Sequence, residues 1–160
     1  MTDFDTPILS VLRYHEIAHH ILPHETEATT IADAAQQRGV DPRQMVKSML
    51  MKDMGGNIVL ACVPGTASVD PNKVRDVMGL RRMTCVESKH VISMTGYAPG
   101  MVTPVAVNQM YPIIFDAALS EFELINISSG SPMAGVEMAY QDLVELCNPI
   151  VADIRRDDAS

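Results

Sequence analysis

Residues 46–63 read VKSMLMKDMGGNIVLACV: two apolar segments, 46–52 and 57–63, joined by Asp53-Met54-Gly55-Gly56. Aspartate and glycine between two apolar segments are typical of the turn of a β-hairpin. Pro64 follows the second segment and marks its end, because proline lacks the backbone N–H that a strand ladder needs. We therefore predict a β-hairpin here, and the other elements are placed outward from it.

Capping residues predict helices on both sides of the hairpin. Ser, Thr and Asp satisfy free N–H groups where a helix begins, and glycine ends helices in the left-handed conformation. The predicted helices are 7–15 after Thr6, 31–38 between Thr30 and Gly39, 70–78 before Gly79, 87–94 and 140–147. Further strands are predicted at 17–22, 82–86, 104–107, 113–116, 122–127 and 135–138. Irregular alternation with a hairpin favours an α+β fold: a single domain with a curved, mixed, barrel-like β-sheet flanked by helices.

Length and composition favour one domain over residues 1–160, with loose ends at about 1–5 and 156–160. Hydrophobic residues make up 47% of the chain, yet no apolar run approaches the ~20 residues of a membrane span. The first five residues, MTDFD, are acidic where a signal peptide is basic. We therefore expect a cytoplasmic protein with no membrane partner. The cysteines, Cys62, Cys85 and Cys147, each lie among apolar residues and are expected to be buried free thiols.

The charge is unevenly distributed. A net charge of −8 argues against DNA binding or any unaided binding of nucleic acid, because lysines and arginines supply most of the affinity for phosphates. Residues 73–90 nevertheless carry five bases and two acids, whereas residues 110–160 carry nine acids and two bases. The basic segment is either a surface that guides the end of a nucleic acid or an ordinary set of solvated charges.

Two loops and one lysine are candidate site elements. Residues 96–104 read GYAPGMVTP, and two glycines with two prolines allow the backbone N–H groups near Gly100 to face an anionic oxygen. The alternative is a rigid connection between two elements. Lys47, in an otherwise apolar strand, is either an edge-strand charge or a cation that points into a pocket. The loop 128–132, SSGSP, is interpreted as a polar turn that lines a pocket.

Two other chemistries are disfavoured. His15, His19, His20 and His24 lie within ten residues, but on a strand His19 and His20 point to opposite faces, so at most two of the four share a centre. We therefore predict no metal site. The serines of the 128–132 loop lack the G-x-S-x-G pattern of a nucleophile elbow and have no histidine nearby.

The ordered series of Asp41-Pro42, Lys47-Ser48-Met49-Leu50, Gly96-Tyr97-Ala98-Pro99-Gly100 and Thr103-Pro104 resembles the YbaK/ProX family of aminoacyl-tRNA editing domains. Members are free-standing or inserted in some bacterial prolyl-tRNA synthetases. The likeness extends to Thr6-Pro7, Gly39-Val40, Val59–Pro64, Ile113–Asp116 and Asp142-Leu143. It implies a trans-editing deacylase that hydrolyses the aminoacyl ester of mischarged tRNA without a metal or cofactor. The implied partners are the acceptor end of aminoacyl-tRNA and prolyl-tRNA synthetase.

Hydrolysis of an aminoacyl ester needs a placed water, donors for the tetrahedral oxyanion and a pocket that rejects the correct amino acid. The resemblance matches the family's lysine to Lys47 and its glycine-loop amides to Gly96 and Gly100. We therefore expect Lys47 and Gly100 to be catalytic. Substrate contacts are expected from Gly96, Tyr97, Pro99, Ser129 and Gly130.

The chain departs from the family pattern at three positions. Met101 stands where many members have a second glycine, and Ile21 and Gly135 stand where members that act on cysteinyl-tRNA often have an aromatic residue and an acid. The amino-acid specificity is therefore open. Two rival functions remain: a module that binds the tRNA acceptor end or the synthetase without turnover, and a deacylase-derived protein that binds a small nucleotide or amino acid.

Overall fold

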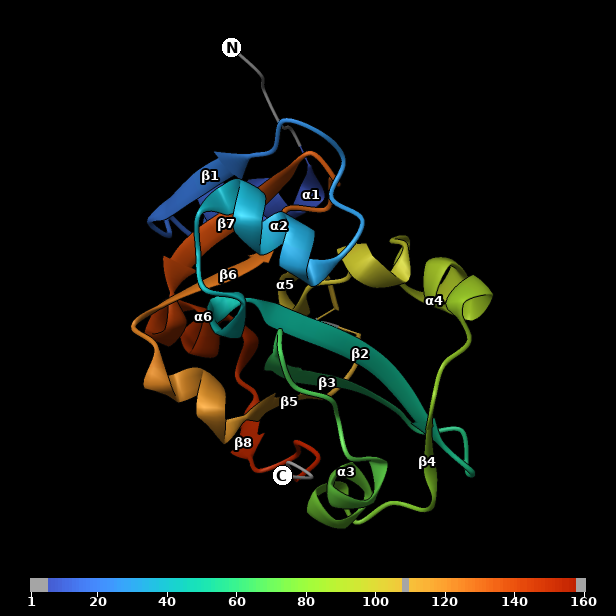
Figure 1. Ribbon diagram of the computed structural model, residues 1–160. Coiled ribbons are helices and arrows are strands. Elements are labelled where there is room, and N and C mark those ends of the chain that lie inside the picture. The colour runs from blue at the N-terminus through green and yellow to red at the C-terminus, as the bar shows by residue number, and fades with distance from the viewer. Residues whose placement is uncertain (1–5, 108–109, 158–160) are drawn as a thin grey trace.

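The computed structural model describes residues 6–107 and 110–157, whose strands form two sheets (Figure 1). The five-stranded sheet has the order β4-β2-β3-β5-β8, and the three-stranded sheet has the order β1-β7-β6. The strands are β1 (His19–Pro23), β2 (Val46–Asp53), β3 (Ile58–Pro64), β4 (Met83–Cys85), β5 (Ile113–Asp116), β6 (Leu124–Ser128), β7 (Ala134–Ala139) and β8 (Ile150–Ala152). A single bridge between Met45 and Asn126 links the two sheets.

Helices flank both sheets, and several begin at the predicted caps. The Thr6 and Thr30 side chains accept hydrogen bonds from Leu9 N and Asp33 N, and Gly39 and Gly79 are left-handed where their helices end. The α-helices are α1 (Pro7–Tyr14), α2 (Ile31–Arg38), α3 (Pro71–Met78), α4 (Ser88–Thr95), α5 (Pro104–Val107) and α6 (Tyr140–Cys147). The 3₁₀ helices are η1 (Pro42–Gln44), η2 (Pro99–Met101) and η3 (Ala117–Glu121).

The predicted hairpin is confirmed, with β2 and β3 antiparallel in a register that pairs Lys47 with Val63. Next to β3, β5 and then β8 add in parallel, so the sheet is mixed. The predicted α+β domain with a mixed sheet is therefore confirmed, although the described strands form two sheets and no closed barrel.

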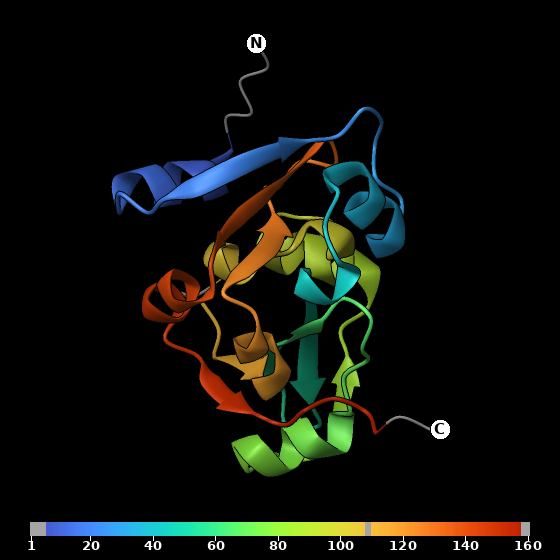
Figure 2. The ribbon, with the colours of Figure 1, turned by 60° about the vertical axis from the view of Figure 1, so that its left-hand side comes forward.

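Both faces of the five-stranded sheet are buried. Leu50, Leu60 and Phe115 face the larger apolar cluster, which also includes residues of α1, α4, α5 and α6. Met51 and Val59 face a second cluster, to which α3 contributes Val74. Figure 2 shows α1 and the three-stranded sheet at one end of the molecule and α3 at the other. Burial on both faces explains why 46–63 is apolar almost throughout rather than alternating.

Two predictions are wrong, and one strand was missed. Residues 104–107 form helix α5 rather than a strand, since Pro104 pre-sets a helical φ at the first position and a four-residue apolar run does not distinguish the two structures. Strand β8 was not predicted, and it is short and half-exposed. Cys85 is exposed, whereas Cys62 and Cys147 are buried as predicted.

Of the ends predicted to be loose, 1–5 and 156–160, residues 1–5 and 158–160 lie outside the described residues, while Arg156 N donates to Ser68 O at 2.8 Å. In the described part of the chain, no helix is both long and apolar enough to cross a membrane.

Candidate functional site

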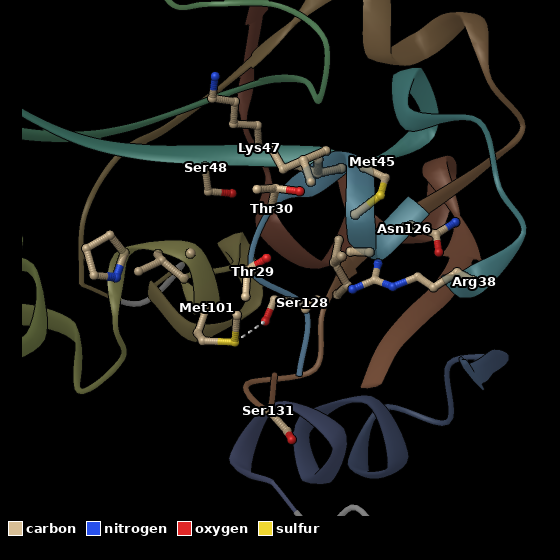
Figure 3. Close-up of a pocket in the computed structure, with 18 of the residues that line it drawn as sticks. Thr29, Thr30, Arg38, Met45, Lys47, Ser48, Met101, Asn126, Ser128 and Ser131 are labelled. Carbon is tan, nitrogen blue, oxygen red and sulfur yellow. Dashed lines mark hydrogen bonds between the residues drawn. The ribbon is translucent and has the colours of Figure 1, made fainter. Parts of the chain in front are cut away.

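A cavity of about 300 Å³ lies where β2, α2, η2 and the end of β6 meet (Figure 3). Its polar side chains come from segments far apart in sequence: His24, Thr29, Thr30, Arg38, Lys47, Ser48, Asn126, Ser128 and Ser131. Two of these residues are cations, and no aspartate or glutamate is among the lining residues that the structure describes. Hydroxyl, amide and cationic donors without carboxylates favour an oxygen-rich or anionic ligand.

Ser48 points from β2 toward the cavity, whereas the side chain of Lys47 lies on the other side of the strand (Figure 3), because successive side chains of a strand point to opposite faces. Ser48 Oγ lies 3.5 Å from Cys62 Sγ. Lys47 Nζ donates to Ala67 O at 3.1 Å, and Figure 3 shows it directed away from Ser48. Lys47 is thus a half-buried cation at the rim of the cavity, bonded to a backbone carbonyl.

Gly100 also lines the cavity, on the wall formed by η2. The residue is exposed, and a Cβ built on it would meet no atom within 4 Å, so the backbone of η2 is open to a ligand. Pro99 precedes it on the same wall. Met101 follows it and accepts a hydrogen bond from Ser128 Oγ through Sδ at 3.8 Å, which connects η2 to the end of β6.

Four predicted site residues are absent from the described lining. Gly96 ends α4 with φ 82°, and its N–H donates to Ile92 O. Ser129 is fully buried, and its Oγ donates to Ala134 O at 2.6 Å. A Cβ on Gly130, which has φ 91°, would press on the Tyr97 ring. These residues shape the two loops, while Ser128 and Ser131 are the residues of the 128–131 turn that reach the cavity.

Sequence reasoning missed Arg38, at the end of α2. Its Nε donates to His24 Nε2 at 3.0 Å, while His24 Nδ1 lies 2.8 Å from Pro132 O. Both contacts are hydrogen bonds when His24 is neutral and carries its proton on Nδ1. Burial lowers the pKa of Arg38 to about 10. A basic residue in the last turn of a helix is common, so the sequence offers no signal that this one reaches a cavity.

Asn126 is the most buried polar side chain of the cavity wall, with an exposed fraction of 0%. Its Nδ2 donates to Glu137 Oε2 at 3.4 Å, and its Oδ1 has no hydrogen-bond partner in the described structure. Sequence reasoning missed it as well, because a lone asparagine within an apolar strand carries no motif.

The three departures from the family pattern have different surroundings. Met101 forms part of the cavity wall. Gly135 lies beneath Arg38, where a Cβ would overlap the guanidinium. Ile21, on β1, pairs with Val136 of β7 and is absent from the described lining of the cavity.

The histidines of the N-terminal segment do not gather into a cluster. Only His24 is among the described lining residues of the cavity, and it is bonded to Arg38 and Pro132. Across residues 6–107 and 110–157, no three His, Cys, Asp or Glu side chains are placed to hold a metal ion.

Comparisons with known proteins point in one direction. The family model of the aminoacyl-tRNA editing domain matches residues 25–146, a span that contains every described lining residue except His24. EbsC of Enterococcus faecalis, named as a proposed Cys-tRNA(Pro)/Cys-tRNA(Cys) deacylase, is 22% identical over 75% of this chain and 73% of its own. A proline–tRNA ligase of Bacillus licheniformis is 30% identical over 68% of this chain but only 18% of its own. The crystal structure of a candidate trans-editing enzyme for prolyl-tRNA synthetase has a TM-score of 0.80 and 26% identity, over 96% of this chain and 99% of its own.

Proposed function

Because the chain belongs to the aminoacyl-tRNA editing domain family, we propose that it hydrolyses the ester that joins a wrong amino acid to tRNA. The observation that carries this proposal is that the family match spans the elements around the cavity. The donor-rich, acid-free lining supports it, since the ester, ribose and phosphate of a charged tRNA end present oxygen acceptors.

The proposed reaction needs no covalent intermediate, metal or cofactor, because the ester is already activated. A water attacks the ester carbonyl carbon and releases a proton to solvent, so that a tetrahedral oxyanion forms; the bond to the ribose oxygen then breaks, and that oxygen takes up a proton from solvent. We assign the backbone N–H of Gly100 as a donor to the oxyanion, since the space above Gly100 is open, whereas Pro99 has no N–H and Met101 N donates to Ala98 O. Placement of water and ester in one cavity supplies the rest of the rate enhancement.

Lys47 is assigned to the ribose or phosphate of the terminal adenosine. Its rim position suits a group outside the reacting ester, and its flexible four-carbon stem allows Nζ to leave Ala67 O for a phosphate oxygen. Pro99 is proposed to contact the substrate directly. Gly96, Tyr97, Ser129 and Gly130 are proposed to act on substrate binding through the shape of the two loops.

The proposed partners are the acceptor end of aminoacyl-tRNA and prolyl-tRNA synthetase. The relative in Bacillus licheniformis is itself a proline–tRNA ligase, of which this chain matches 18% of the length. We propose the cytoplasm as the compartment, because tRNA is charged there.

The test is a deacylation assay on a panel of mischarged tRNAs that share the tRNA for proline. We expect catalytic release of at least one amino acid, unchanged by a metal chelator, with correctly charged prolyl-tRNA left intact. Binding of the tRNA without turnover on every member would instead support a non-catalytic acceptor-end module. A small nucleotide or amino acid that binds with no tRNA activity would support the second rival.

A further inference from the structure

The Arg38 guanidinium has no counter-ion among the residues that the structure describes. No carboxylate lies within 4 Å of it in the described structure, and none is among the described lining residues. Its Nε donates to His24 Nε2, and its Nη1 is buried with no acceptor in the described structure. Burial of a charged group costs free energy unless a counter-ion or a hydrogen-bond acceptor pairs with it.

The guanidinium is nevertheless held in a fixed place. His24 receives the Nε hydrogen bond and is itself bonded to Pro132 O. Gly135 lies beneath the guanidinium, and a side chain at this position would occupy the space that the guanidinium fills. When a donor already has a fixed position, less conformational entropy is lost as the ligand binds.

Asn126 provides a second, independent sign that a ligand belongs here. It is fully buried, it lines the same cavity, and its Oδ1 has no partner in the described structure. Figure 3 shows Arg38 and Asn126 on one side of the cavity and Met101 of η2 on the other. When a substrate ester lies against η2, the cavity thus leaves the space beside Arg38 for another part of the substrate, to which we assign the amino-acid side chain.

We propose that Arg38 is a specificity-determining residue, which selects aminoacyl groups whose side chain carries an acceptor oxygen. This inference rests on the proposed function. A hydroxyl or carboxylate oxygen accepts from the guanidinium, whereas an apolar side chain of the same size leaves the donor unpaired. A hydroxyl can in addition donate to Asn126 Oδ1 after a small shift of the amide.

The experiment measures binding apart from turnover. Calorimetry with non-hydrolysable 3′-aminoacylamino-3′-deoxyadenosines compares threonyl with valyl, which differ by a hydroxyl, and aspartyl with leucyl, which differ by a carboxylate. In the unaltered protein we expect at least one oxygen-bearing analogue to bind on the order of 10-fold more tightly than its apolar match. The pair that shows the preference identifies the hydroxyl or the carboxylate as the selected group.

Two variants assign the preference to Arg38. Arg38→Met keeps a long side chain without the donors, and Gly135→Ala leaves the arginine present but displaces its guanidinium. Both variants are expected to bind the two analogues of each pair with nearly equal affinity, so that the ratio of their dissociation constants is close to one. Arg43→Met, which removes an arginine from an exposed ion pair with Asp41, is the matched control and is expected to keep the ratio.

The outcomes separate this inference from the proposed function. Equal binding within both pairs, no binding of any analogue, or a preference that survives Arg38→Met overturns the role of Arg38, even if mischarged tRNA is hydrolysed. An Arg38-dependent preference without hydrolysis of any mischarged tRNA supports the role of Arg38 and contradicts the deacylase.

Discussion

Lys47 is half-buried, and its Nζ donates to the backbone carbonyl oxygen of Ala67. We predict that Lys47→Ala lowers kcat/KM for mischarged tRNA at least ~10-fold, or ~1.4 kcal/mol of transition-state stabilisation. The stability should change by no more than about 1 kcal/mol, because one hydrogen bond is lost. Deacylation kinetics and urea unfolding of the same preparation measure both quantities.

Lys47→Arg distinguishes a compact ammonium from positive charge in general. The guanidinium is planar and broader, so it should restore only part of the rate at a rim that fits a lysine. An active deacylase that is indifferent to both substitutions would show that Lys47 has no part in the reaction.

The three cysteines should react at different rates. Burial raises the pKa of Cys62 to about 12, and burial together with the nearby Cys62 raises the pKa of Cys147, so neither forms much thiolate near pH 8. Cys85 is exposed. A disulfide reagent should therefore modify one thiol rapidly in the native protein and the other two only after unfolding. Cys85→Ser should abolish the rapid phase; if a rapid phase persists, one of the buried thiols is accessible.

At the scale of elements, the turn of the β2–β3 hairpin is organised by Asp53. The nearly buried carboxylate accepts hydrogen bonds from Gly55 N and Asn57 N, and a third from Arg81 N before β4. The hydrogen bonds, with that from Asn57 N the largest influence, lower the pKa of Asp53. Asp53→Asn should lower the urea midpoint at pH 7, because an amide presents only one oxygen to these donors.

The pH dependence of this effect follows from the direction of the pKa shift. A carboxylate with a lowered folded pKa stabilises the fold fully above its unfolded pKa, and the contribution is lost as pH falls through the folded pKa. The difference in urea midpoint between the wild type and Asp53→Asn should therefore shrink below about pH 3.9, the usual aspartate value. A difference that is constant down to pH 2 would mean that the charge of Asp53 contributes nothing.

Elements with a local chemical signal were predictable from the sequence. Thr6, Thr30, Gly39 and Gly79 each bound a helix as predicted, because a cap depends on residues within one turn. The strand β8 could not be predicted, since three half-exposed residues form it only by pairing with β5. Arg38 could not be assigned either, because its place in the cavity depends on His24 and Gly135, which are distant in sequence.

At the scale of the whole molecule, ion pairs alter the charge pattern that the sequence suggests. Within the basic segment 73–90, Lys73 contacts Asp153 and Asp157, while Arg75 and Lys89 pair with acids close in sequence. Arg81 and Arg82 are exposed, and neither forms an ion pair in the described structure. These two arginines are therefore the part of the segment best suited to phosphates.

We predict that Arg81→Glu with Arg82→Glu weakens the use of tRNA but spares hydrolysis of a small aminoacyl ester, because neither residue is among the described lining of the cavity. The fold should persist, since the hydrogen bonds from Arg81 N to Asp53 and from Met54 N to Arg82 O use only the backbone. The loss should be largest at low salt, where phosphate contacts are strongest. Arg156→Glu, an exposed charge reversal in the acidic C-terminal part, is the control for charge alone, compared with Arg81→Glu and Arg82→Glu made singly. Measured across salt concentrations with both substrates, tRNA turnover that equals that of the wild type would place the docking surface elsewhere.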